Sequence, residues 1–149
     1  MSNDDLSDIT LRLERLIPSA PEVLFALWTD PTQLLLWWAP EGYEPSVDIL
    51  ETRPGGRWRI TLHRPDGSTI AMSGVYLIVE PPRRLAFTWA WEDASGTRGH
   101  ETEVVVNFET THGGTRLSLM QQRFEGKQAR DNHNVGWSSS FDRLAKFAG

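Results

Sequence analysis

The chain has 149 residues, of which 39% are hydrophobic, and its formal net charge is -5. This length fits one domain that can bury roughly 70% of its unfolded surface. The acidic balance argues against nucleic acid as a partner. No segment reaches the about eighteen apolar residues that span a bilayer, so we expect no membrane contact.

Two further features concern the compartment in which the protein works. Cysteine is absent, which excludes disulfides and thiolate chemistry and fits a reducing environment. The first residues are acidic and polar, unlike the basic and apolar start of a secretory signal. We therefore expect one cytoplasmic domain over residues 1–149, with residues 1–7 forming a flexible N-terminus.

Residues 8–17 are the first predicted element, because apolar and polar side chains alternate there as in a half-buried strand. The next segment, Ser19–Glu22, has the pattern of a capping box. Apolar residues then follow at helical spacing as far as Trp28. The sequence therefore predicts a strand that is followed closely by a helix.

A second, short helix is predicted directly afterwards. Asp30 is a favourable N-cap residue, and Pro31 suits the first helical position. Pro40 and Gly42 then predict that this helix ends just after Trp38. Two short helices are therefore expected after the first strand.

The middle of the chain predicts strands joined by hairpin-length connections. Gly55–Gly56 and Gly113–Gly114 are expected to supply the positive φ of tight turns, and Pro81–Pro82 interrupts the pattern. Such short connections favour an antiparallel meander. The predicted strands lie near residues 45–52, 57–64, 68–79 and 85–92, and then around 104–108 and 117–119.

Residues 126–149 are the one long segment with a helical pattern. Trp137, Phe141, Leu144 and Ala148 recur at offsets that place them on one helical face, and His133 joins that face one turn earlier. Such an apolar stripe is expected to pack against the concave face of the sheet. The predicted fold is α+β, with a curved antiparallel sheet of about six to seven strands around this helix.

Eight motifs, in order along nearly the whole chain, carry a resemblance to a known family. They are Pro18–Phe25, Trp28–Pro31, Leu36–Pro40, Arg53–Trp58, Gly74–Tyr76, Glu80–Trp89, Gly113–Leu119 and Gly136–Trp137. The sequence resembles the SRPBCC or START-like superfamily, and within it the activator of Hsp90 ATPase homologue 1-like (AHSA1-like) proteins. This resemblance implies the helix-grip fold, with a ligand cavity between the sheet and the last helix. It does not imply one function, because family members differ in what they do.

The aromatic residues allow two interpretations, a cavity wall or the filling of a small core. The resemblance favours the cavity. Gly136 beside Trp137 is expected either to let the last helix approach the sheet closely or to contact a ligand. Trp28 and Trp37 are expected in the core beside the short helices. The predicted ligand-binding residues are Trp38, Trp58, Met72, Phe87, Trp89, Trp91, Phe124, His133, Trp137 and Phe141.

His133 is the one candidate for proton transfer, because it shares the helical face of Trp137 and is expected to have a pKa near neutrality. The alternative is a satisfied or partly exposed helix histidine. Arg59, His63, Glu101 and Glu103 fall on the outward faces of their strands. No H-x-x-x-H spacing, G-x-S-x-G elbow or phosphate loop occurs, so we expect neither metal nor cofactor.

Three hypotheses for function follow. The first is binding of a small hydrophobic or aromatic molecule in the cavity. The second is a polyketide cyclase or aromatase-like enzyme, with His133 as its base. The third is an Hsp90-type co-chaperone module, as the family name implies.

For the third hypothesis, eukaryotic co-chaperones carry an additional N-terminal domain that this sequence does not show. The acidic net charge also offers no basic docking patch, so we expect no chaperone interaction. An exposed edge strand could pair to form a homodimer.

Overall fold

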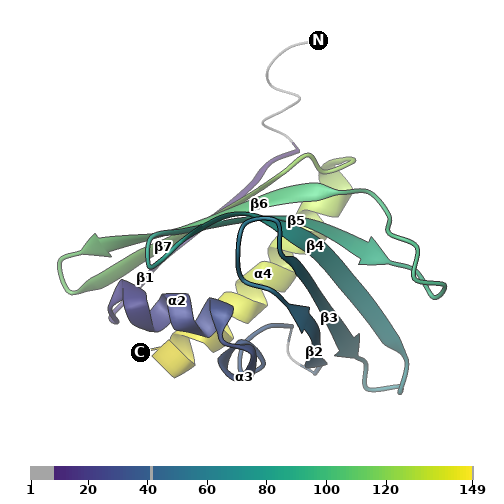
Figure 1. Ribbon diagram of the computed structural model, residues 1–149, viewed down its shortest axis with the longest axis horizontal. Helices are drawn as coiled ribbons and strands as arrows, with labels where there is room; N and C mark the ends of the chain where they lie inside the picture. Colours follow the sequence, from purple (N-terminus) through teal and green to yellow (C-terminus); the bar gives the residue numbers. More distant parts are fainter. Residues whose placement is uncertain (1–8, 41, 149) are drawn as a thin grey trace, which may run out of the picture.

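The computed structural model describes residues 9–40 and 42–148, so the predicted flexible segment 1–7 lies outside the described part. One layer of helices lies against one face of a single curved sheet (Figure 1). None of the described helices is long and apolar enough to cross a membrane. The elements are β1 (Leu11–Ile17), α2 (Pro21–Thr29), α3 (Pro31–Leu34), β2 (Glu44–Leu50), β3 (Arg57–His63), β4 (Thr69–Glu80), β5 (Arg84–Glu92), β6 (Thr102–Thr111), β7 (Gly114–Gln122) and α4 (Lys127–Ala148).

The sheet contains seven strands in the order β1-β7-β6-β5-β4-β3-β2. Every neighbouring pair is antiparallel, so β2 to β7 form a meander and β1 adds to its far edge beside β7. The α4 helix crosses the concave side of this sheet, with α2 and α3 beside its C-terminal half (Figure 1). The predicted helix-grip architecture is confirmed.

The start of α2 differs from the prediction. Its N-cap is Ala20, which makes no side-chain capping bond, and Pro21 occupies the first helical position. The predicted capping box was wrong because Ser19 lies one position too early. The Ser19 carbonyl instead accepts a hydrogen bond of 2.6 Å from Thr115 Oγ1, which ties the entry of α2 to β7.

The predicted cap of α3 is confirmed. Asp30 Oδ1 accepts hydrogen bonds from the backbone N–H groups of Thr32, at 2.9 Å, and Gln33, at 3.2 Å. Two of the donors that a helix N-terminus leaves unpaired are thereby satisfied. The helix is shorter than expected, however. It ends at Leu34 and not just after Trp38.

The glycine pair at the β2–β3 turn has two different roles. Gly55 has a φ of +82°, as predicted. Gly56 does not have a positive φ, so that part of the prediction was wrong. A Cβ at Gly56 would lie 1.9 Å from the Glu51 carbonyl oxygen, and close backbone packing is therefore what requires glycine there.

Aromatic side chains pack densely where α2 and α3 meet the sheet and α4. Trp37 is fully buried, and its Nε1 donates a hydrogen bond of 2.7 Å to the Leu27 carbonyl. The Trp28 ring stacks on Trp137 with centroids 5.9 Å apart, and Phe25 contacts Phe108 at 5.4 Å. Trp28 and Trp37 thus lie in the core, as the sequence predicted. This packing fills one end of the space between sheet and helix.

Candidate functional site: a cavity between the sheet and the last helix

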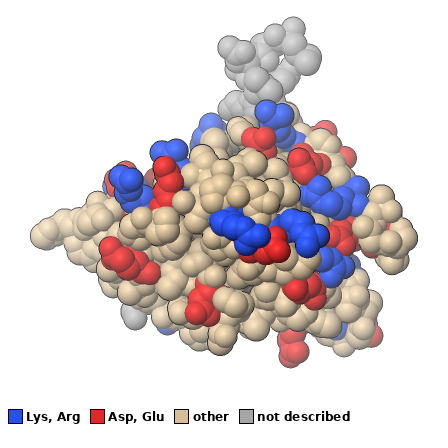
Figure 2. All heavy atoms as spheres, viewed as in Figure 1, with Lys and Arg blue, Asp and Glu red and all other residues tan. Residues whose placement is uncertain are grey.

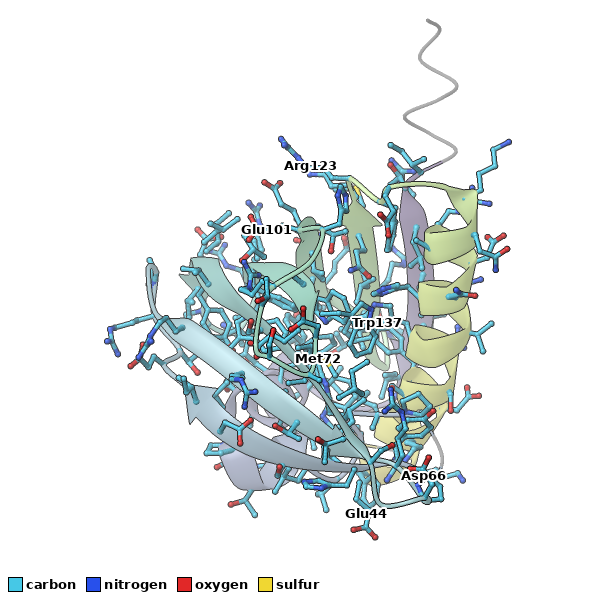
Figure 3. All side chains as sticks on the ribbon, turned by 90° about the vertical axis from the view of Figure 1, so that its right-hand side faces the viewer. Glu44, Asp66, Met72, Glu101, Arg123 and Trp137 are labelled. Atoms are coloured by element: carbon cyan, nitrogen blue, oxygen red, sulfur yellow. The ribbon has the colours of Figure 1, made fainter. Side chains whose placement is uncertain are left out.

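The other end of that space holds a cavity of about 620 Å³. This volume is within the range of about 300–1,000 Å³ typical of sites for small molecules. Figure 3 shows Trp137 on the α4 side of the space and Met72 on the strand side. The apolar wall consists of Trp38, Ala39, Pro40, Leu62, Ile70, Met72, Trp89, Trp91, Phe124, Ala129 and Trp137.

Strand register explains how the sheet builds its part of this wall. Met72 on β4 pairs with Trp91 on β5, and Trp89 pairs with Thr102 on β6. Alternate residues of a strand share one face, so Trp89 and Trp91 both point to the concave side. Trp91 is 38% exposed, because it lies at the mouth of the cavity.

Seven of the ten predicted ligand-binding residues line the cavity: Trp38, Met72, Trp89, Trp91, Phe124, His133 and Trp137. Trp58, Phe87 and Phe141 do not. These three residues form a second layer behind the cavity wall. Trp58 lies behind Trp38, with ring centroids 5.9 Å apart. Phe87 lies behind Trp58 at 5.6 Å, and Phe141 behind Trp137 at 6.1 Å. Ligand contact by the seven stays a prediction.

A chain of buried hydrogen bonds fixes the orientation of Trp137. Its Nε1 donates to Gln121 Oε1 at 2.8 Å, and Gln121 Nε2 donates to Thr102 Oγ1 at 2.8 Å. Thr102 Oγ1 in turn donates to the Trp89 carbonyl at 3.1 Å. Because these buried groups satisfy one another, the Trp137 ring is held in one position on the cavity wall.

His133 lies among three aromatic rings of the wall. Its ring centroid is 4.5 Å from that of Trp89, 4.9 Å from that of Phe124 and 5.9 Å from that of Trp91. Burial lowers the pKa of His133 to about 4, so the imidazole is neutral at neutral pH. No hydrogen bond to its ring nitrogens joins it to another described residue. A neutral imidazole can donate one hydrogen bond to a ligand and accept another.

The burial of His133 predicts a loss of stability in acid. The unfolded chain takes up a proton on this residue near pH 6.5, whereas the folded chain does so only near pH 4. The stability that the fold retains by burying a neutral His133 is therefore complete above about pH 6.5. It is lost as the pH falls to about 4. At about 1.36 kcal/mol per pKa unit, the loss is up to about 3 kcal/mol.

Urea unfolding across this pH range measures the loss. Carboxyls with lowered pKa values, such as Asp66 and Asp93, also destabilise the fold in acid, so a reference is needed. His133→Phe keeps an aromatic ring but cannot take up a proton, and it is expected to flatten the dependence. Identical pH profiles for the wild type and His133→Phe would contradict the assignment.

Polar contacts from α4 hold the segment that carries Trp38. The adjacent Ala39 has a φ of +130°, which is unusual for a residue with a side chain. Its N–H donates to Ser140 Oγ at 3.2 Å, and its carbonyl accepts from Arg143 Nη1 at 3.1 Å. Arg143 Nη2 also donates to the Leu36 carbonyl at 3.2 Å. Trp38 is thereby fixed as one end of the cavity.

Of the two interpretations of Gly136, close packing against the sheet is wrong. A Cβ at this position would meet only Pro40 Cγ, at 3.9 Å, so the helix does not approach the sheet closely there. Gly136 instead lines the cavity. The absent side chain leaves space open where the sequence suggested a tight contact.

The cavity lining contains several polar residues that sequence reasoning missed. Thr102 and Arg64 could have been found, because each continues the inward alternation of a predicted strand. The others come from loops and from the polar edge of α4, whose positions depend on tertiary folding. Together with the predicted His133, the polar lining consists of Tyr43, Arg64, His100, Thr102, Glu125, Asn132 and Ser140. Of these, His100 Nε2 also hydrogen-bonds the Arg123 carbonyl.

A curved antiparallel sheet around one long helix, with a cavity between them, defines the helix-grip class of START-like proteins. The family model described as "Activator of Hsp90 ATPase homolog 1-like protein" matches residues 18–149. The chain belongs to this family.

Solved structures agree with this assignment. The AHSA1 protein of Silicibacter pomeroyi is 36% identical, with a TM-score of 0.85 over 92% of this chain and 95% of that one. A protein from Chromobacterium violaceum is 26% identical, with a TM-score of 0.87 over 94% and 96% of the two chains. One from Rhodobacter sphaeroides, 24% identical, shares the fold, with a TM-score of 0.80 over 94% of this chain and 92% of that one. No curated protein matches the chain.

Proposed function

We propose that this protein binds a small hydrophobic or aromatic molecule in the cavity between the sheet and α4. The observation that carries the proposal is the open space of about 620 Å³ beside a densely packed aromatic core. Protein interiors are close-packed, and voids larger than a water molecule are few. An aromatic and aliphatic wall with a few polar groups is typical of sites for small apolar ligands.

The state of His133 favours binding over the cyclase-like alternative. A general base is most effective when its pKa lies near the working pH. With a pKa of about 4, His133 is a weak base at neutral pH. It is better suited to a hydrogen bond with a neutral ligand group, such as a hydroxyl or a carbonyl. We therefore assign it a role in ligand recognition.

The family description refers to an activator of Hsp90 ATPase, but the surface offers little support for a chaperone role here. On the face in Figure 2, basic and acidic residues are interspersed and do not gather by sign. Ion pairs join many of the described charged residues, such as Arg116 with Glu109 at 2.9 Å and Arg59 with Asp48 at 2.6 Å. Paired charges provide little steering toward a partner of one sign. We propose the cavity as the functional element.

A fluorescence titration with N-phenyl-1-naphthylamine tests the proposal. This uncharged aromatic probe emits strongly only in apolar surroundings. We expect saturable enhancement with one site per chain. Quenching of protein emission should accompany it, because Trp89, Trp91 and Trp137 line the cavity. A probe signal that does not saturate, together with unchanged tryptophan emission, would contradict the proposal.

A further inference from the structure

Arg64 places a positive charge on the wall of the cavity. It follows the last residue of β3 and comes two positions after Leu62, so it continues the inward face of that strand. Its backbone N–H donates to the Ser68 carbonyl at 2.9 Å, which extends the β3–β4 hairpin. The half-buried side chain lines the cavity beside Leu62 and Ile70.

This charge forms no ion pair with a described carboxylate. Asp66 is nevertheless a counter-charge to it, because the pKa of Asp66 is lowered first by hydrogen bonds from Ser68 and further by the positive charge of Arg64. The contacts of the Arg64 guanidinium are hydrogen bonds from Nη1 to Ser68 Oγ, at 3.1 Å, and to the Thr69 carbonyl, at 3.4 Å. No described carboxylate lies within ion-pair distance of it, and its Nε and Nη2 make no hydrogen bond to a described residue. Among the described lining residues, Arg64 is also the only lysine or arginine. The Nε and Nη2 donors of the planar Arg64 guanidinium therefore remain available to a ligand.

The one lining carboxylate among the described residues comes from a different part of the sheet. It is Glu125, on the segment that leads from β7 into α4. Arg64 directly follows β3, and three strands lie between β3 and β7 in the sheet. The two charged lining residues therefore reach the cavity from separate places.

We propose that the ligand is an amphipathic carboxylic acid, whose apolar or aromatic body lies between the sheet and α4 and whose carboxylate binds Arg64. This inference rests on the proposed cavity function and adds the chemical class of the ligand. The carboxylate accepts charge-assisted hydrogen bonds from Nε and Nη2, the fork geometry that arginine offers to carboxylates. Glu125 disfavours the reversed orientation through like-charge repulsion.

A matched pair of probes tests this class. At neutral pH 2-naphthoate is ionised, whereas 2-naphthamide has nearly the same shape without charge. Displacement of bound N-phenyl-1-naphthylamine reports the affinity of each. We expect the wild type to bind the acid more tightly than the amide. Arg64→Met should weaken naphthoate about tenfold and change naphthamide by less than about twofold, as for a charge-assisted pair at a partly exposed site.

Two variants control for general effects. Arg83→Met removes a positive charge from the β4–β5 turn, at the opposite end of β4 from Arg64. It should change the affinity for neither naphthoate nor naphthamide. Arg64→Lys keeps the charge but not the fork, so an intermediate loss of naphthoate binding is expected. Added salt should reduce the preference for the acid. Retained binding of N-phenyl-1-naphthylamine shows that each variant is folded.

The possible failures are distinguishable. If N-phenyl-1-naphthylamine binds the wild type but naphthoate is not preferred over naphthamide, the acid site is overturned and the cavity function stands. The acid site is likewise overturned if Arg64→Met weakens the binding of naphthoate and naphthamide equally, or weakens the binding of neither. If none of the three compounds binds the wild type, the cavity function is overturned together with this inference.

Discussion

Replacing Gly136 with phenylalanine is expected to weaken the binding of N-phenyl-1-naphthylamine at least tenfold, which corresponds to about 1.4 kcal/mol or more. A Cβ at this position meets only Pro40 Cγ, at 3.9 Å, so the new ring can enter the cavity without moving the backbone. Gly136 lies inside α4, where phenylalanine has a higher helix propensity than glycine. The variant should therefore fold at least as stably as the wild type while losing the ligand.

This separation of binding from stability is the informative result. Asn134→Phe adds the same side chain on the exposed side of the same helix and serves as the matched control. It should leave the affinity for the probe unchanged. Unaltered binding by a stably folded Gly136→Phe variant would mean that the probe occupies another place.

Gly74→Ala is expected to destabilise the fold by about 3 kcal/mol or more. The added Cβ would lie 1.8 Å from the Thr88 carbonyl oxygen and 2.6 Å from Trp58 Nε1. These atoms form the hydrogen bond of 3.1 Å that holds the Trp58 ring behind Trp38. Relief of the clash requires β4 and β5 to separate, because neither contact is with the end of a flexible side chain.

Chemical denaturation monitored by circular dichroism measures this effect. Gly126→Ala is the matched control, since a Cβ at Gly126 would meet no atom within 4 Å and this glycine has no positive φ. Its free energy of unfolding should stay within about 0.5 kcal/mol of the wild-type value. A Gly74→Ala protein as stable as this control would show that β4 and β5 tolerate a wider spacing.

The architecture was predictable because its local signals agree with one another. Alternation over Leu85–Trp91 indicated a strand with one buried face, and hairpin-length connections indicated antiparallel neighbours. The offsets of Trp137, Phe141 and Leu144 indicated one apolar stripe on the last helix. Such periodic patterns report which face of an element is buried. They were sufficient for the fold, together with the family resemblance.

The depth of each residue below the cavity surface was not predictable in the same way. Trp58 and Phe87 do point to the concave side, but the segment around Trp38 folds over them. Phe141 shares the face of Trp137 yet lies one turn deeper, in the core. Periodicity predicts the direction in which a side chain points but not how deeply it lies below the cavity surface. That depth depends on where the segment around Trp38 and the helix α4 cross the sheet.

The polar part of the site was missed for a related reason. Gln121 follows Leu117 and Leu119 on an inward face, and a polar residue at such a position signals a buried hydrogen-bond network. Its partners Thr102 and Trp137 come from distant segments, so the sequence alone could not name them.

The central claim is that the space between the sheet and α4 holds a small apolar ligand. The most direct test is a crystal structure of the wild-type protein with 6-bromo-2-naphthol, located by the anomalous signal of bromine. We predict one strong bromine peak inside the cavity, between Met72 and Trp137. Peaks confined to the outer surface, with side chains filling the interior, would contradict the claim.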